Sequence, residues 1–265
     1  MVCMDTNNKS SNVTNTNNSI VKSIQLLNTF SMEKPRLRLK EISLLTGISQ
    51  PTAYRMLNTL KQFGLVEQQD NMYSLGLGLL KYESIVLNSI TLRRVCLPYL
   101  EELSMRQKVN VNLAVLEGIE VVYVARAETP YCRYGYFHVG MRRPIYCTAL
   151  GKVLVCKKPE LVSQVFAHGA IQCTLNTITN EDAFREEIER VRLQGYATDL
   201  EEWQNGSNCI AAPIYDVAGN VIAGVSISGP VSSYTREQIL SYRPVLLEYC
   251  AQLSLAMQNI GTSGS

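Results

Sequence analysis

The sequence predicts an α+β protein in two parts, a small helical unit that ends in a short hairpin and a larger unit with a mainly antiparallel sheet. Of 265 residues, 46% are hydrophobic and 18% are charged, which allows two cores and excludes a wholly disordered chain. Up to residue 75 the apolar residues recur mainly at helical spacing, whereas beyond residue 109 some segments alternate with period two. Strands grouped apart from helices are typical of an α+β fold.

The two ends of the chain predict no packed structure. Ten of the twelve residues 7–18 are Asn, Ser or Thr, so we expect residues 1–18 to form a disordered tail. Residues 261–265 (GTSGS) predict a flexible end. The first residues do not resemble a signal peptide, and no apolar run approaches the roughly 18 residues of a membrane span. We expect a cytoplasmic protein with no membrane partner.

Residues 19–75 predict a winged helix-turn-helix, because three helices are followed by a β-hairpin. The second helix stops at Gly47, and Ser49 caps a third helix that tolerates Pro51 in its first turn. Apolar segments on both sides of the polar residues 68–71 indicate the hairpin. The buried stripe expected on the third helix consists of Ala53, Met56, Leu57 and Leu60.

The charge of this unit favours contact with DNA. The net charge of the chain is only +2, but residues 34–61 hold six Lys or Arg against one acidic residue, Glu41. Polar side chains outside the buried stripe can donate to phosphates or read base edges. A solvated basic face and a helical domain for protein contacts are the alternatives. The candidate DNA-binding residues are Arg36, Arg38, Lys40, Ser49, Gln50, Thr52, Tyr54, Arg55, Asn58 and Lys61.

Residues 76–94 predict a single linker helix, because apolar residues recur there at helical spacing. Its stripe could pack on its own domain or on a partner subunit. Residues 95–260 predict the sheet domain, beginning with a helix that has Pro98 in its first turn. The expected strands are 109–115, 119–127, 132–139, 209–215 and 220–228, and the expected helices are 148–156, 159–167, 180–194 and a C-terminal region bent at Pro244.

The segment 209–228 predicts a hairpin whose two faces differ. Pairing Tyr215 with Asn220 around the loop 216–219 places Cys209 opposite Ser226. One face is then apolar and belongs to a core, whereas the other is small and partly polar and suits a cavity wall. Alternatively, the small residues admit a closely packed helix. The small face holds Cys209, Ala211, Pro213, Ile222, Gly224, Ser226 and Ser228, and the apolar face holds Ile210, Ala212, Ile214, Val221, Ala223, Val225 and Ile227.

Motifs for metal binding and catalysis are not recognisable. The eight cysteines include no C-x-x-C pair, and His138 and His168 have no neighbour at metal-ligand spacing. The glycine-containing segments lack residues that a dinucleotide loop, a P-loop or a nucleophile elbow requires. We therefore expect no metal, no cofactor and no catalytic residue.

Three blocks of the sequence carry a family likeness. The first is residues 39–60, with the end of the hairpin at 73–76; the second is residues 140–152. The third, residues 195–213 (GYATDLEEWQNGSNCIAAP), continues into residues 223–228 and is long and specific. Together the blocks resemble the IclR family of bacterial transcription regulators, and residues 140–152 are most similar to the branch of the keto-deoxygluconate regulator.

This resemblance implies a winged helix-turn-helix domain, a linker helix and a GAF-like effector-binding domain. It also implies homodimers or dimers of dimers on pseudo-palindromic double-stranded DNA operators. Arg55 matches an arginine found almost throughout the family, on the helix that would read DNA. Gln50 and Pro51 replace the usual Lys-Ser, and Cys147 stands where Ser or His is commoner. The implied effector pocket consists of Ala149, Leu150, Asp199, Cys209, Ser226 and Ser228.

The sequence therefore predicts a DNA-binding transcription regulator, with repression as the expected action. Its operator binding would be modulated by a small metabolite, a keto or sugar acid. One alternative is an enzyme of the GAF-like domain with Cys209 as its nucleophile. The other is a protein–protein adaptor, which would show no steep dependence of DNA binding on salt.

Overall fold

The computed structural model describes residues 16–132 and 137–262. The chain divides into two compact units, Met1–Val86 and Leu87–Ser265, and each is described by itself. None of the helices in the described residues is long and apolar enough to cross a membrane.

The first unit is a three-helix domain with a small antiparallel sheet. Its core joins all three helices to the sheet through fully buried Leu26, Ile42, Leu57 and Val66. The strand order is β1-β3-β2, so the short first strand completes the hairpin. The elements are α1 (Asn18–Leu27), β1 (Arg36–Arg38), α2 (Leu39–Thr46), α3 (Gln50–Gln62), β2 (Val66–Gln69) and β3 (Met72–Leu75).

Both chain ends carry more structure than the sequence predicts. Helix α1 begins at Asn18, because the Asn17 side chain accepts a hydrogen bond from the backbone N–H of Ser19 at 3.0 Å. The tail expected up to residue 18 is therefore wrong at its last residues, while residues 1–15 lie outside the described part. Helix α10 likewise extends to Thr262, so the flexible end does not begin at 261.

The single helix expected over 76–94 is also wrong. Helix α4 spans Leu79–Ser89, and α5 begins at Thr91 after Ile90, which has an extended backbone. Residues 76–78 are bonded to the segment before β2 instead, since the backbone N–H groups of Gly76 and Gly78 donate to the carbonyl oxygens of Leu65 and Gly64 at 2.9 and 3.0 Å. Gly76 lies so close to Gly64 that an added Cβ would come within 2.2 Å of its carbonyl oxygen. Pro98 does not lie in a first turn, since α5 runs on both sides of it to Gln107.

The second unit is built on one antiparallel sheet of six strands in the order β6-β5-β4-β9-β8-β7. All five strand pairs are antiparallel. The strands are β4 (Asn110–Glu117), β5 (Glu120–Ala127), β6 (Arg142–Pro144), β7 (Ala197–Leu200), β8 (Ser207–Tyr215) and β9 (Val221–Pro230). The helices after α5 are α6 (Ala149–Val155), α7 (Glu160–Ala167), α8 (Glu181–Gln194), α9 (Arg236–Ser241) and α10 (Arg243–Thr262).

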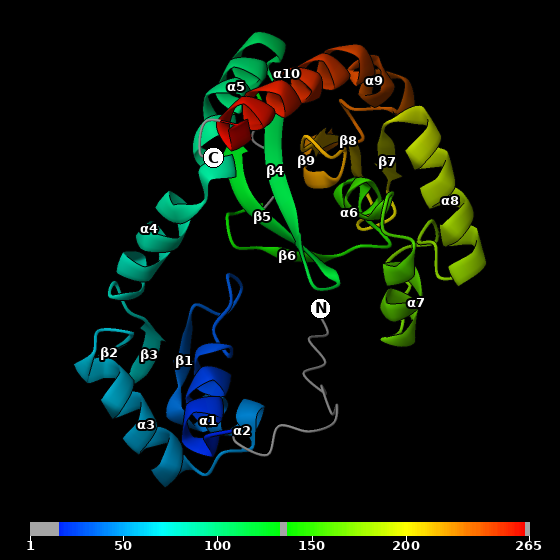
Figure 1. The fold of residues 1–265 in the computed structure, drawn as a ribbon. Coiled ribbons are helices and arrows are strands. Elements are labelled where there is room, and N and C mark those ends of the chain that lie inside the picture. The colour runs from blue at the N-terminus through cyan, green and yellow to red at the C-terminus, as the bar shows by residue number, and fades with distance from the viewer. Residues whose placement is uncertain (1–15, 133–136, 263–265) are drawn as a thin grey trace. The chain divides into compact units, whose positions relative to one another are not determined.

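Helices cover both faces of this sheet, as Figure 1 shows. Helices α5 and α10 pack together on one face, over the core that includes Ile210, Val225 and Ile227. Helix α6 packs on the other face and is backed by α8, through Phe184 and Ile188. The short, fully buried α6 is thus held between the sheet and α8, next to the small-residue side of the central hairpin.

The hairpin of β8 and β9 has the predicted faces but a different register. Cys209 pairs with Ser228 rather than with Ser226, a shift of two residues that leaves the side chains of residues 209–214 and 223–228 on their expected faces. Within the hairpin the register shifts between Ile214 and Tyr215, which is a β-bulge. Because of this bulge Val221 packs in the core beneath α6, and Ile222 packs against the core on the opposite face of the sheet. The sequence assigned these last two residues to the wrong faces because it predicts no bulge.

One expected strand is not where the sequence placed it. Cys132 and the residues 137–139 lie outside any strand, and residues 133–136 fall outside the described part. The strand at that edge of the sheet is β6, which is only three residues long. The short β7 was missed as well, since four residues give too little alternation to recognise.

The packing of α8 behind α6 gives a stability prediction. Phe184 is fully buried on α8, whereas Leu193 on the same helix is 72% exposed. Phe184→Ala should lower the free energy of unfolding by about 3–5 kcal/mol, because it leaves a cavity in the core. Leu193→Ala is the control and should change it by less than about 0.5 kcal/mol. Urea unfolding followed by circular dichroism measures both; equal losses would contradict the packing described.

Candidate functional site

The candidate DNA-binding residues lie in the first unit on β1, α2 and α3, with Ser49 directly before α3. Ala53, Leu57 and Leu60 face the core, which confirms the predicted stripe of α3. As a consequence the other side of α3 is open to solvent. Of the ten candidates, Thr52 and Asn58 are half-buried, and eight are exposed: Arg36, Arg38, Lys40, Ser49, Gln50, Tyr54, Arg55 and Lys61.

Local contacts join α3 to the hairpin beside it. The Lys61 ammonium donates to the Gln68 side chain on β2 at 3.2 Å. Arg36 and Lys61 border the same open groove together with Gln68 and Gln69. The end of α3, β1 and the hairpin therefore present polar and cationic groups on one continuous surface, as contact with a phosphate backbone requires.

The start of α3 differs in detail from the prediction. Ser49 occupies the N-cap position, but its hydroxyl donates to the Thr52 hydroxyl at 3.0 Å instead of accepting from a backbone N–H. The acidic residue among these cations, Glu41, accepts from the backbone N–H of Arg38 at 2.7 Å and so caps α2. Its charge lies at the positive end of a helix rather than across the α3 surface.

The six predicted effector residues lie together in the second unit. They border one cavity between α6, the β8–β9 hairpin and the turn after β7. The free volume of the cavity is only about 10 Å³. This is too small for a metabolite, which can therefore enter only if side chains move. The lining residues are the predicted Ala149, Leu150, Asp199, Cys209, Ser226 and Ser228, with Asn112, Tyr123, Phe137, Thr148, Trp203 and Ser207.

Asn112 is a polar residue of this cavity that the sequence reasoning missed. It lies on β4 and is 1% exposed, and its amide nitrogen donates weakly to the hydroxyls of Ser226 and Ser228, each at 3.4 Å. Its amide oxygen is buried and has no partner within the described residues. A buried acceptor without a donor is costly, so a ligand hydroxyl placed here would gain a favourable bond.

Asp199 supplies the ionisable group of the cavity. One carboxylate oxygen accepts from the backbone N–H of Glu202 at 2.7 Å and, more weakly, from that of Trp203 at 3.3 Å. Burial and the nearby carboxylate of Glu202 raise the pKa of Asp199 to about 7, although the Glu202 N–H and Lys152 act in the opposite direction. Asp199 is thus able to accept or donate a hydrogen bond near neutral pH.

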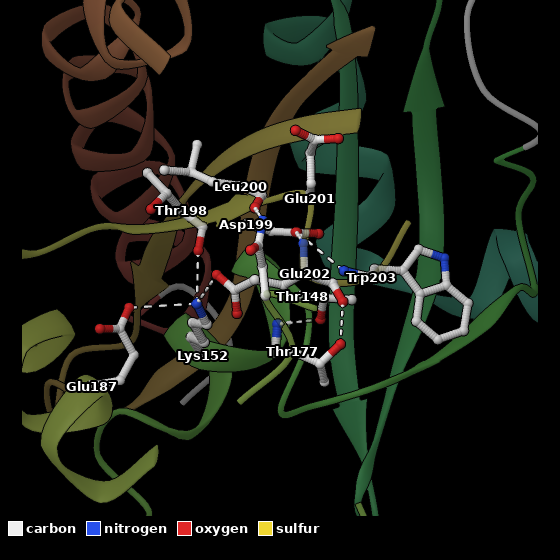
Figure 2. A network of polar contacts seen from close by, with 12 residues as sticks. Thr148, Lys152, Thr177, Glu187, Thr198, Asp199, Leu200, Glu201, Glu202 and Trp203 are labelled. Carbon is white, nitrogen blue, oxygen red and sulfur yellow. Dashed lines mark hydrogen bonds and ion pairs between the residues drawn. The ribbon is translucent and has the colours of Figure 1, made fainter. Parts of the chain in front are cut away.

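A buried lysine on α6 contacts residues of β7, of the turn after it and of α8, as Figure 2 shows. Lys152 on α6 is 1% exposed, and its ammonium lies 2.6 Å from Glu202 Oε1 and 3.4 Å from Glu187 Oε1. It also donates to the backbone oxygen of Thr198 at 2.8 Å. Lys152 therefore links α6, which carries Ala149 and Leu150, to β7, which carries Asp199, and to the turn after it.

Cys209 does not have the properties of a nucleophile. Burial raises the pKa of its thiol, and the carboxyl group of Asp199 raises it further, which disfavours the thiolate. The described residues contain no group of three His, Cys, Asp or Glu side chains that could hold a metal ion. The arrangement suits reversible binding of a small polar molecule.

Some of the missed lining residues left a signal in the sequence. Asn112 falls on the polar side of an alternating segment, between the apolar Val111 and Leu113. Thr148 directly precedes a helix and caps it, accepting from the backbone N–H of Gly151 at 3.1 Å. Tyr123 and Phe137 gave no signal, because their place in the cavity depends on the pairing of distant strands.

A winged helix-turn-helix unit together with a second unit that encloses a polar pocket defines a DNA-binding transcription regulator with an effector-binding domain. The chain belongs to the IclR family of these regulators. The model of the IclR helix-turn-helix domain matches residues 19–70, and that of the bacterial transcriptional regulator IclR C-terminal domain matches residues 84–255.

Similar proteins span nearly the whole chain. The transcriptional regulator KdgR of Escherichia coli K12 is 32% identical over 90% of this chain and 92% of its own. XynR of the same organism is 30% identical over 90% and 96%. The IclR structure from Thermotoga maritima matches with a TM-score of 0.71 at 29% identity, over 91% of this chain and 98% of that chain. KdgR and XynR are described as HTH-type transcriptional regulators, the class of protein that the sequence predicts for this chain.

The raised pKa of Asp199 gives a pH prediction. Between about pH 4 and 7 the folded protein keeps a proton that the unfolded chain has released, so this residue makes stability fall as pH rises. Asp199→Asn cannot titrate. Its free energy of unfolding relative to the wild type should therefore increase between pH 5 and pH 8 in urea unfolding. A difference that is the same at both pH values would show that Asp199 has an ordinary pKa.

Proposed function

We propose that this chain is a homo-oligomeric repressor whose operator binding is modulated by a small keto or sugar acid held in the second unit. As an operator-binding regulator it would act in the bacterial cytoplasm. The observation that carries the proposal is the convergence of Asn112, Asp199, Ser226 and Ser228 on one buried cavity. Outside a ligand site, so many buried polar groups with few partners would be costly.

The chemistry of these groups favours a ligand rich in hydroxyl groups. Ser226 and Ser228 can donate to a carboxylate or a ketone oxygen, and the unpaired Asn112 oxygen can accept from a hydroxyl. Asp199 accepts from a hydroxyl when it is ionised and donates when it is protonated. The ionised form of Asp199 repels the carboxylate of an acidic ligand. This repulsion is avoided when the hydroxyl groups of the ligand face Asp199 and its carboxylate points away. The nearby Trp203 and Tyr123 offer apolar surface to the carbon skeleton.

Exposed apolar side chains support self-association. Helix α4 buries none of its residues, and Tyr82, Ile85 and Val86, which lie on one side of it at positions i, i+3 and i+4, are each at least 55% exposed. Such a contiguous apolar surface is typical of a protein interface. A second copy of the chain would cover it, and a symmetric dimer would match two half-sites of a pseudo-palindromic operator. In a dimer of dimers, each dimer would form through this surface, and the two dimers would associate through a second interface.

The proposed DNA contact is tested with Arg55→Ala. The exposed guanidinium of Arg55 would contact DNA, so its loss should weaken binding to duplex DNA from upstream of the gene by about 1–3 kcal/mol, or about 5- to 150-fold. Lys81→Ala, which removes an exposed cation from α4, is the control. Gel shifts at several salt concentrations measure both; an effect equal for the two variants, or binding with no steep salt dependence, would favour the adaptor alternative.

The proposed pocket is tested by thermal shift with pyruvate, gluconate and 2-ketogluconate. A ligand present at about 100 times its Kd stabilises the native state by about 2.7 kcal/mol and so raises the Tm. Ser228→Ala and Asn112→Ala should reduce that rise, whereas Ser241→Ala, at the exposed end of α9, should not. A Tm rise that survives both pocket substitutions would place the ligand elsewhere.

A further inference from the structure

A buried cation lies beside the pocket, on the face of the sheet that bears it. The Arg126 side chain on β5 is only 9% exposed. In the sheet Arg126 is paired with Asn112 of β4, which on its other side is paired with Ser226 of β9. Directly opposed residues of antiparallel strands share a face and have their Cβ atoms about 5 Å apart. Arg126 therefore continues a row of side chains in which Asn112 and Ser226 line the cavity.

An aromatic side chain connects this cation to the cavity. Phe137 lines the cavity, and the centroid of its ring lies 5.6 Å from the guanidinium carbon of Arg126. At this distance the guanidinium is attracted to the ring. The same ring contacts Tyr123, another lining residue, with the two centroids 5.5 Å apart. Because the cavity admits a metabolite only when side chains move, a change in the rotamer of Phe137 would open it toward the guanidinium.

The ion pair that Arg126 forms is one that a ligand can replace. Its Nε lies 2.6 Å from Oε1 of Glu128, whose side chain is 66% exposed. An exposed carboxylate loses little when its cation is taken away, because water hydrates it. A buried guanidinium, in contrast, is costly without an anionic or polar partner. A ligand carboxylate held against the sheet can therefore take the place of Glu128 at little cost.

The charges around the cavity define an orientation for an acidic ligand. Asp199 lies on β7 and Arg126 on β5, and three strands, β4, β9 and β8, lie between them in the sheet. The ionised form of Asp199 repels a carboxylate, whereas the guanidinium of Arg126 attracts it. Both effects favour the same orientation, with the carboxylate toward β5 and the hydroxyl groups toward β7.

We propose that Arg126 binds the carboxylate of the effector and so selects hydroxylated acids over neutral molecules of the same shape. The planar guanidinium can hold a carboxylate by two parallel, charge-assisted hydrogen bonds. A neutral sugar or amide forms no such ion pair, although it can still bond to Asn112 and to the pocket hydroxyls. This inference rests on the proposed function, to which it adds the group that recognises the acid.

The test is isothermal titration calorimetry of the full chain with gluconate and with gluconamide, its neutral amide on the same carbon skeleton. The wild type should bind gluconate about tenfold more tightly than gluconamide, since a hydrogen bond to a charged group is the stronger one. Arg126→Gln should bind both with the affinity that the wild type has for gluconamide. Arg126→Lys, which keeps the charge, should retain part of the preference. Arg142→Gln removes an exposed arginine of β6 and, as the control, should keep all of it.

The results that would overturn the proposal can be told apart from failure of the proposed function. Equal affinities for the two ligands in the wild type, or a preference for gluconate that persists in Arg126→Gln, would show that Arg126 does not bind the carboxylate. If Arg126→Gln binds neither ligand, Arg126→Lys decides. A remaining preference for gluconate supports the proposal, and loss of both ligands there too makes Arg126 a structural residue. A wild type that binds neither ligand would count against the proposed function itself.

A second arginine provides a further discriminating variant. The guanidinium carbon of Arg143 on β6 lies 4.6 Å from the ring centroid of Trp203, which also lines the cavity. Arg143→Gln should leave the tenfold preference for gluconate in place. If the preference disappears in Arg143→Gln and persists in Arg126→Gln, the carboxylate binds at Trp203 and its assignment to Arg126 is wrong.

Discussion

The ion pair between buried Lys152 and Glu202 is the interaction on which the second unit depends. A lysine that is 1% exposed is tolerated only with partners, and here Glu202, Glu187 and the Thr198 carbonyl oxygen surround its ammonium. Because Lys152 belongs to α6 and Glu202 to the turn after β7, this contact fixes the width of the cavity between them. Loss of Lys152 or Glu202 would leave the other charge buried without its partner, and α6 would no longer be fixed to the turn after β7.

This arrangement explains how a cavity can be polar and yet well ordered. The turn after Asp199 is held by Lys152, which contacts the Glu202 carboxylate, and by Thr174 and Thr177, whose hydroxyls donate to the Glu202 carbonyl oxygen. Asp199 itself keeps two backbone donors on one oxygen. The polar groups of the pocket are therefore held in place by hydrogen bonds and an ion pair behind them. A ligand can then replace weak contacts such as those of Asn112 without disturbing the sheet.

The sequence predicted the secondary structure well wherever periodicity was long. The stripe of α3, the alternation in β4 and the faces of the β8–β9 hairpin, apart from Val221 and Ile222, follow from side-chain spacing alone. The six pocket residues were expected together from the resemblance to the IclR family, and the expected hairpin pairing put three of them on one face. Structural features that depend on a single residue, or on contacts between residues distant in the sequence, could not be predicted. The break at Ile90, the bulge that exchanges Val221 and Ile222, and the partners of Lys152 are of this kind. In each case the cause is tertiary packing and not local propensity.

The central claim is that a ligand in the second unit changes DNA binding by the first. The direct measurement is the Kd for upstream DNA, with and without the acid that raises the Tm, for the wild type and Ser228→Ala at equal salt. The account predicts that the acid shifts the Kd of the wild type by a factor of about 5–150 and has little effect on the variant. A wild-type Kd that is unchanged by an acid bound in the pocket would contradict it.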